Sequence, residues 1–516
     1  MYLTQALHRS LQVSPDDVMT ICADRVRTVR QVADRIARLA GGLRSLGISD
    51  GDRVAMLALN SDRYHEYLLA VPWANGVLNP VNTRWSVPEI AYSFVDSDTK
   101  ILIIDDAFLP MLEALRASYP ALRAVIHCGD GPPPEGCLSY EELIAASEPV
   151  DDARRGGDDV AGIFYTGGTT GFPKGVALSH RNLLVQYYGV LASRYFLRPG
   201  GRFLHAAPMF HLADLAGWGA QLIFGGAHVF IPSFDPAAVL TAIQDRRVTD
   251  TILVPTMVRL VVDQLRPGQH DVSSLKAVVC GGSPLSRALL DEAKRAFPSA
   301  SFMQGYGMTE VAAVATLLGP AEYEAFPDVM MSCGRAMPHN EIRIVDAEQN
   351  EVPRGTFGEI VVRGGNVMLG YWNKPDATAS TVRNGWMHTG DGGYMDEHGF
   401  VFIIDRIKDM IVTGGENVYS AEVENAVAAH PGVAACAVIG VPDADWGERV
   451  HAVIVARPGF DLAAAQIREH VKTLIAGYKA PRSVEFVDAL PVSGAGKIQK
   501  HELRRKYWAE ADRQVN

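Results

Sequence analysis

The sequence predicts an α/β fold, with a large N-terminal domain of stacked, mainly parallel sheets and a small C-terminal α+β domain. Two observations predict it. Short apolar runs alternate with helical patterns as far as about residue 342, and a shorter α/β pattern fills the last hundred residues. The 516 residues allow three or four units at the usual ~150 residues each. With 48% hydrophobic and 21% charged residues, burying a large core is no obstacle.

The first 150 residues supply the first strands and helices. Apolar residues at helical spacing predict a helix over 29–46 that stops at Gly47. Short apolar runs at 54–59 and 101–104 predict strands, and the Pro/Gly-rich stretch 130–134 predicts a surface loop.

The alternation continues in the next two hundred residues. Buried strands are predicted at 160–165, 203–206, 251–254 and 277–280. After residue 341 the pattern changes, because 341–345 and 359–362 partly alternate polar and apolar residues. That alternation is typical of a half-exposed strand pair.

The last hundred residues read as a separate unit. Helices are predicted at 420–430 and 462–475, and strands at 433–441 and 450–456. We place the boundary at 405–408, which divides the chain into 1–404, a hinge at 405–408, and 409–516.

Composition excludes several classes of partner. The net charge of −11 and the lack of a long basic run argue against nucleic-acid binding. None of the six cysteines forms a C-x-x-C pair, and no apolar stretch approaches the ~20 residues that span a bilayer. We expect a soluble cytoplasmic protein with no integral membrane segment; the sequence leaves a homodimer open.

The most informative stretch is a glycine- and threonine-rich loop after the strand at 160–165. Open glycine backbone can point N–H groups at an anion, threonine hydroxyls can donate to it, and a lysine adds positive charge. Its members are Thr166, Gly167, Gly168, Thr169, Thr170, Gly171 and Lys174. It does not fit the Walker pattern G-x-x-x-x-G-K-[ST]. Taken alone, it is almost equally compatible with a surface turn.

Five further motifs follow in order. They are 304–310 (QGYGMTE), 389–391 (TGD), 405–411 (DRIKDMI), 414–418 (GGENV) and 494–498 (GAGKI). Together with the loop, they closely resemble the adenylate-forming superfamily of acyl-CoA synthetases, peptide-synthetase adenylation domains and luciferases. Fatty-acid–CoA ligases are the nearest group. The resemblance implies a distorted β-barrel subdomain and a mobile C-terminal lid.

The resemblance also implies roles for individual residues. Tyr306 would stack on adenine, Thr309 would touch the α-phosphate and Glu310 would hold Mg²⁺. Asp391, assisted by Arg406, would bind the ribose. The residues it assigns to ATP or AMP are Thr166, Gly167, Gly168, Thr169, Thr170, Gly171, Lys174, Gly282, Ser283, Gln304, Gly305, Tyr306, Gly307, Thr309, Asp391, Arg406 and Lys497. Those it assigns to catalysis are Lys497, Thr309, Glu310 and Lys174.

Other positions concern the acceptor and the hinge. Lys408 occupies the hinge position, where relatives carry aspartate, and Gly414 and Gly415 resemble the lining of a coenzyme A tunnel. Gly167 stands where many relatives have serine, so one hydroxyl contact is absent.

The acyl pocket is the least determined part. Its candidate residues are His211, Trp218, Val254, Met257, Gly281 and Met308. His211 fits either a pocket entrance or a core histidine. The small residues Gly217 and Gly219 suit a hydrophobic tail, whereas Asp214 is expected to be a surface or cap residue.

These features predict an ATP-dependent acid–thiol ligase that uses Mg²⁺ and coenzyme A. A medium- or long-chain fatty acid is the first choice of substrate. The alternatives are an aromatic or alicyclic acid, in which Trp218 would cap a short pocket, and transfer to a carrier protein. An α/β-hydrolase is disfavoured because 281–285 (GGSPL) lacks the last glycine of the G-x-S-x-G nucleophile elbow. A dinucleotide-binding dehydrogenase is disfavoured because no G-x-G-x-x-G follows an early strand.

Overall fold

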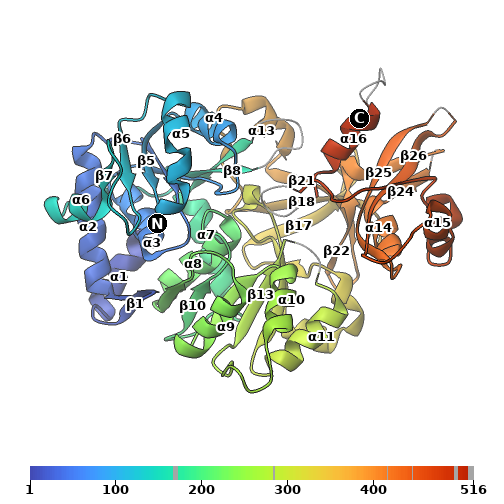
Figure 1. Ribbon diagram of the computed structural model, residues 1–516, viewed down its shortest axis with the longest axis horizontal. Helices are drawn as coiled ribbons and strands as arrows, with labels where there is room; N and C mark the ends of the chain where they lie inside the picture. The colour runs from blue at the N-terminus through green and yellow to red at the C-terminus, as the bar shows by residue number, and fades with distance from the viewer. Residues whose placement is uncertain (167–172, 283–284, 415, 444, 493–497, 509–516) are drawn as a thin grey trace.

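The computed structural model describes residues 1–166, 173–282, 285–414, 416–443, 445–492 and 498–508. Figure 1 shows the chain passing from a first sheet (blue), through a second (green), to a small C-terminal unit (orange to red).

The first sheet has eight strands, in the order β19-β9-β8-β4-β3-β5-β6-β7. Five neighbouring pairs are parallel, whereas β8, β9 and β19 pair antiparallel. The strands are β3 (Arg53–Leu57), β4 (Val77–Pro80), β5 (Thr99–Ile104), β6 (Ala124–His127), β7 (Leu138–Ser139), β8 (Val160–Thr166), β9 (Lys174–Ser179) and β19 (Gly370–Tyr371). The helices in this stretch are α1 (Gln5–Val13), α2 (Val29–Ser45), α3 (Asp62–Trp73), α4 (Val87–Ser97), η1 (Asp106–Met111), α5 (Leu112–Ser118) and α6 (Tyr140–Ala146).

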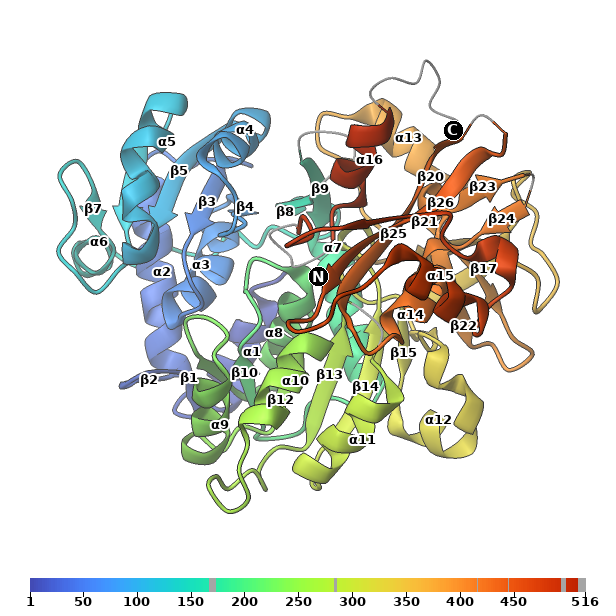
Figure 2. The ribbon, with the colours of Figure 1, turned by 45° about the vertical axis from the view of Figure 1, so that its right-hand side comes forward.

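The second sheet has nine strands, in the order β16-β15-β14-β13-β12-β10-β11-β1-β2. They are β1 (Val18–Cys22), β2 (Arg25–Thr28), β10 (Arg202–His205), β11 (Ala227–Phe230), β12 (Asp250–Leu253), β13 (Ala277–Gly281), β14 (Ser301–Tyr306), β15 (Thr316–Leu318) and β16 (Arg335–Ala336). The helices here are α7 (His180–Ala192), α8 (Leu212–Phe224), α9 (Pro236–Asp245), α10 (Pro255–Gln264), α11 (Arg287–Ala296), η2 (Thr309–Val311), α12 (Pro320–Ala325) and η3 (Pro327–Met331). Figure 2 shows α9, α10 and α11 beside β12 and β13, where they bury one apolar cluster against the sheet.

A five-stranded antiparallel sheet follows, in which β20 and β22 both pair with β21; we refer to it as the half-barrel. It consists of β17 (Asn340–Val345), β18 (Gly358–Gly364), β20 (Val382–Arg383), β21 (Trp386–Met395) and β22 (Val401–Arg406), with α13 (Pro375–Thr381) beside it. The β17–β18 pair confirms the predicted half-exposed strands.

The C-terminal unit has its own sheet and its own apolar core. Its elements are η4 (Ile407–Asp409), β23 (Ile411–Thr413), β24 (Glu416–Val418), α14 (Ser420–Ala428), β25 (Val433–Asp443), β26 (Gly447–Ala456), α15 (Ala464–Lys472), η5 (Gly477–Lys479), β27 (Ser483–Phe486) and α16 (Lys500–Trp508). The structure thus confirms the predicted α/β class and the small terminal domain.

One predicted residue environment is wrong. Asp214 was expected to be a surface or cap residue, but it is fully buried on α8, with Oδ2 2.6 Å from Nδ1 of His205. His205 Nε2 lies 3.0 Å from Nδ1 of His228, so a carboxylate and two imidazoles form a chain inside the core. An acidic residue in the first turn of a helix resembles a cap in sequence, and only the tertiary partner distinguishes the two roles.

Buried histidine also predicts loss of stability in acid. Burial, and then the charge of His205, lower the pKa of His65 to about 3. The ring lies in the core, and its Nδ1 accepts a hydrogen bond from the indole N–H of Trp218. As the pH falls, His65 therefore binds a proton in the unfolded chain at a higher pH than it does in the folded chain. Stability is full above the ordinary pKa of about 6.5 and falls by about 1.4 kcal/mol per pH unit below it. His65 alone then lowers the free energy of unfolding by about 3 kcal/mol at pH 4.

Urea unfolding from pH 4 to pH 8 measures this effect. In His65→Gln, whose amide oxygen can accept from Trp218, we expect a shallower fall between pH 6.5 and pH 4. The control is His398→Gln, because His398 is exposed. Equal slopes for wild type and His65→Gln would contradict the prediction.

Candidate functional site

The predicted phosphate loop connects β8 to β9. Thr166 pairs with Lys174 across this antiparallel hairpin, so both ends of the loop are fixed by the sheet. Residues 167–172, which include Gly167, Gly168, Thr169, Thr170 and Gly171, lie outside the described residues. The ammonium of Lys174 lies 4.8 Å from the centre of the Tyr371 ring, close enough for a cation–π interaction.

Tyr371 joins this lysine to the predicted metal ligand. Its hydroxyl donates to Oε1 of Glu310 at 2.8 Å, and Glu310 is buried. Burial, and then the charge of Glu310, raise the pKa of Tyr371, so the phenol keeps its proton and remains a donor. Sequence reasoning missed Tyr371; its only local signal is an aromatic pair after Gly370.

A second cluster forms where β14 meets the half-barrel. Asp391 lies opposite Arg406 in the β21–β22 ladder, with Oδ1 2.8 Å from the arginine Nε. Its Oδ2 accepts from the hydroxyl of Tyr306 at 2.6 Å. Burial raises the pKa of Tyr306, and the carboxylate raises it further. The structure therefore brings Tyr306 to a carboxylate that lies 85 positions further along the chain.

Glu359 holds the turn before Asp391. Its Oε1 accepts from the backbone N–H of Gly390 at 3.0 Å, and its Oε2 lies 2.7 Å from Nδ1 of His388. Gly390 has φ +71°, which favours glycine. Sequence reasoning missed Glu359, because it acts from a neighbouring strand.

Two parallel strands end together beside this cluster. Gly281 on β13 pairs with Gly305 on β14, and Gly282 follows with φ +82°. Carboxyl ends of parallel strands are where ligands bind in α/β sheets. Gln304 has a structural role: its side chain accepts from the N–H of Leu285 and donates to the carbonyl of Ser332.

The segment after β14 turns sharply. A Cβ on Gly307 would lie 1.8 Å from the carbonyl oxygen of Ala313, so only glycine fits this backbone. Thr309 and Glu310 then lie on the short helix η2, with Met308 immediately before it. Met308 packs partly buried against the cluster around Val362 and Met387.

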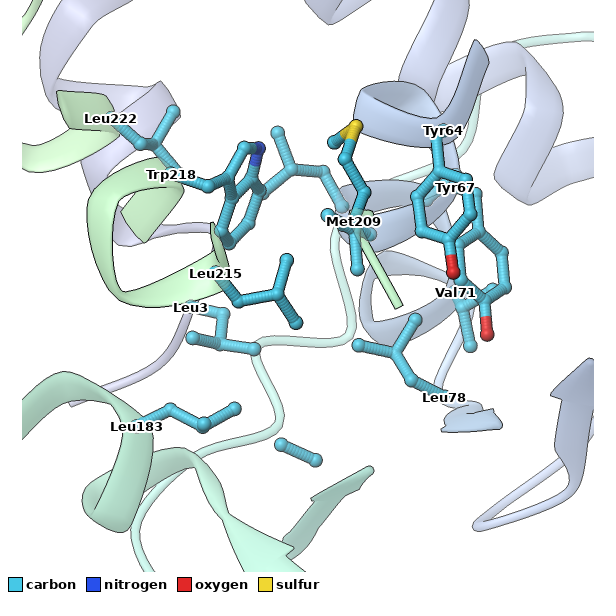
Figure 3. Packing of buried hydrophobic residues seen from close by; sticks show 14 of the residues in the cluster. Leu3, Tyr64, Tyr67, Val71, Leu78, Leu183, Met209, Leu215, Trp218 and Leu222 are labelled. Carbon is cyan, nitrogen blue, oxygen red and sulfur yellow. The ribbon is translucent and has the colours of Figure 1, made fainter. Parts of the chain in front are cut away.

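The candidate acyl residues separate into two groups. Val254 precedes α10 and faces Gly282, since a Cβ there would lie 3.6 Å from the valine Cγ1. Met257 is partly buried on α10, and the ring of His211, at the start of α8, lies 4.2 Å from that of Phe210. By contrast, Trp218 is 1% exposed within the main core, where Figure 3 shows it beside Leu215.

The two glycines expected to make room for a tail do not do so. A Cβ on Gly217 would lie 2.3 Å from the Phe203 ring, and one on Gly219 would lie 2.1 Å from the Tyr187 ring. Aromatic rings therefore fill the space beside this part of α8. Close helix packing explains both glycines, and the position of the acyl pocket stays a prediction.

The C-terminal candidates are described only in part. Gly414 has φ +61°, and its N–H donates to the carbonyl of Trp446 at 2.8 Å. Lys408 lies in η4, next to the contact in which Ser420 donates to Oδ2 of Asp405 at 2.6 Å. Ser283, Gly415 and Lys497 lie outside the described residues.

Glu310 fits a magnesium ion bound together with a nucleotide. Mg²⁺ prefers oxygen ligands and commonly takes one or two carboxylates plus substrate phosphates. Within the described residues, no group of three histidines, cysteines or acids could hold a metal alone. The remaining ligands would therefore come from phosphate and water. None of the described helices is long and apolar enough to cross a membrane.

The sequence matches two family models. The model described as "AMP-binding enzyme" matches residues 7–372, and "AMP-binding enzyme C-terminal domain" matches residues 422–497. A feruloyl-CoA synthase of an Amycolatopsis species is 40% identical, covering 97% of this chain and 98% of the relative. The medium/long-chain-fatty-acid–CoA ligase FadD8 of Mycobacterium tuberculosis is 36% identical, covering 94% and 86%.

Solved structures agree over nearly the whole chain. The anthranilate CoA ligase AuaEII in complex with anthranoyl-AMP matches with a TM-score of 0.88 and 29% identity, covering 99% of this chain and 98% of that one. ATP-bound MatB from Rhodopseudomonas palustris matches with a TM-score of 0.87 and 33% identity, covering 98% and 99%.

Proposed function

The chain belongs to the AMP-binding enzyme family and is an acid–thiol ligase, and from that premise we propose that it joins a compact aromatic carboxylic acid to coenzyme A through an acyl-adenylate. The observation that carries the reaction is a pair of polar clusters that the short segment from Tyr306 to Glu310 connects. Lys174, Tyr371 and Glu310 form one, and Tyr306, Asp391 and Arg406 form the other.

The clusters suit the two ends of ATP. Lys174 and the loop behind it offer positive charge and N–H groups to the β- and γ-phosphates. Tyr306 offers a ring face to adenine, while Asp391 and Arg406 offer an acceptor and a donor to the ribose. Thr309, three residues beyond Tyr306, would then face the α-phosphate.

The first step needs positioning and charge stabilisation. A carboxylate oxygen of the acid attacks the α-phosphorus, the bond to the β-phosphate oxygen breaks, and pyrophosphate leaves with the electron pair. Magnesium held by Glu310 and phosphate would supply charge neutralisation. Lys174, Thr309 and Lys497 would stabilise the developing negative charge on the phosphoryl oxygens. No side chain has to remove a proton, since the acid is already ionised.

The second step replaces AMP by a thiol. The sulfur of coenzyme A attacks the acyl carbonyl, its proton passes to solvent, and AMP leaves. Rotation of the C-terminal domain about Lys408 would withdraw Lys497 and bring Gly414 and Gly415 to the site. The hydrogen bond from Ser420 to Asp405 spans this hinge, so the rotation would have to change this contact.

The filled space beside α8 supports a compact acid. Phe203 and Tyr187 occupy the positions next to Gly217 and Gly219, and Trp218 is hydrogen-bonded within the core. A long tail would have to displace these rings. The relatives that act on feruloyl and anthraniloyl groups favour the same class of acid.

A fatty acid is the second candidate. FadD8 and the fatty acid–[acyl-carrier-protein] ligase ScoC of Streptomyces coeruleorubidus, both 36% identical, support it. The apolar pair Val254 and Met257 would suit either class of acid. Because ScoC is a ligase for an acyl-carrier protein, transfer of the acyl group to a carrier protein is a further alternative.

An acid panel tests the proposal. We expect ATP, Mg²⁺ and coenzyme A to give thioesters of hydroxycinnamic and benzoic acids at least tenfold faster than those of C8–C16 fatty acids, measured by mass spectrometry. Pyrophosphate exchange into ATP with the same acids isolates the first step. Faster turnover of fatty acids would reject the aromatic assignment, and no exchange with any acid would reject the activity.

A further inference from the structure

We propose that Tyr371 is a positioning residue that couples the phosphate-binding lysine to the metal-binding carboxylate. The inference rests on the proposed function, which gives Lys174 and Glu310 their ligands. Tyr371 itself touches neither phosphate nor metal in this assignment. It acts by fixing where the two charged groups lie.

The tyrosine contacts both groups through different parts of its side chain. Its hydroxyl donates to Oε1 of Glu310 at 2.8 Å, while its ring face lies 4.8 Å from the ammonium of Lys174. A hydrogen bond to a charged acceptor is directional, whereas a cation–π contact depends mainly on the ring face. The two contacts can therefore be removed separately.

The backbone around Tyr371 is held on several sides. In the β19–β9 ladder it lies opposite Val176, two residues after Lys174. Its N–H donates to Oγ1 of Thr378 at 2.9 Å, and the next N–H, of Trp372, donates to the carbonyl of Gly175 at 2.7 Å. The ring thus approaches Glu310 from a fixed strand.

Glu310 is held at its backbone as well. Its carbonyl accepts from the N–H of Met368 at 2.9 Å, three residues before Tyr371. Because the phenol binds Oε1, the hydrogen bond selects one orientation of the carboxylate and leaves Oε2 as the natural ligand for a metal.

The test separates the hydroxyl from the ring. Tyr371→Phe keeps the ring face and loses the hydrogen bond to Glu310. We expect the dissociation constant of Mn²⁺ for the enzyme with a non-hydrolysable ATP analogue, measured by electron paramagnetic resonance, to rise about tenfold. At saturating Mg²⁺ we expect the KM for ATP to change less than twofold. Tyr371→Leu, which also loses the ring face, should raise that KM as well.

A matched control exists elsewhere in the chain. The hydroxyl of Tyr195 lies 3.1 Å from both carboxylate oxygens of Glu322, so Tyr195→Phe removes the same type of bond away from the site. It should leave Mn²⁺ affinity unchanged. In a Glu310→Gln background, Tyr371→Phe should add nothing further, because the effect passes through that carboxylate.

The outcomes are distinguishable from those of the proposed function. If wild-type enzyme exchanges pyrophosphate but Tyr371→Phe binds Mn²⁺ as tightly as wild type, the positioning role is rejected and the activity stands. An additive loss in the Glu310→Gln background also rejects it. If the wild type exchanges no pyrophosphate, the activity itself fails.

Discussion

Lys497→Ala should slow acyl-adenylate formation by about 10²–10³-fold, as is usual when a preorganised charge-stabilising group is removed. The attack of the carboxylate brings two anions together, and a lysine between them offsets their repulsion. α16 begins three residues after Lys497, and it is tied to the C-terminal core because Lys500 lies 2.8 Å from Glu424. We therefore expect this domain to deliver the lysine to the site. Pyrophosphate exchange with the preferred acid measures the loss.

The second half-reaction supplies the internal control. When acyl-adenylate is provided directly, Lys497→Ala should form thioester at close to the wild-type rate, because we expect that step to use the rotated domain. Lys472→Ala, which removes a lysine paired with Glu469 on α15, should affect neither step. Equal loss of both half-reactions in Lys497→Ala would contradict the domain-rotation mechanism.

Gly307→Ala should lower kcat/KM for ATP by about 10²-fold, the cost typical of misplacing reacting groups by about 1 Å. The added Cβ would lie 1.8 Å from the carbonyl oxygen of Ala313, and backbone cannot yield as a flexible side chain does. The backbone of this turn has little room to adjust, because Ala312 and Ala313 already have φ of +56° and +121°. Relief of the clash must shift Thr309 and Glu310.

The comparison is Gly477→Ala, because nothing lies within 4 Å of a Cβ at that position. It should keep wild-type kinetics. A thermal unfolding curve for each variant separates a displaced site from a general loss of stability. A folded Gly307→Ala enzyme with unchanged kcat/KM would show that the segment moves freely.

The strands and helices could largely be predicted from local pattern. The helix expected over 29–46 is α2, Val29–Ser45, and Gly47 follows with φ +85°. The strand expected over 101–104 is β5, Thr99–Ile104. Such elements follow from side-chain periodicity and from turn residues, both of which are local properties.

The ordered motifs also grouped residues whose nucleotide-binding role stays a prediction. Tyr306, Asp391 and Arg406 were grouped by resemblance to a family, and the structure brings them into direct contact. Sequence spacing alone could not have done so, because their contacts depend on how β14 meets the β21–β22 ladder.

By itself, the sequence determined the class of fold, the order of the elements and the motifs of an acid-activating enzyme, because these depend on patterns within short segments. Only the tertiary structure decided that Asp214 is buried against His205, that Phe203 and Tyr187 fill the space beside the helix glycines, and that Tyr371 joins Lys174 to Glu310. Each of these depends on which side chains meet across elements, and packing between distant segments fixes that choice.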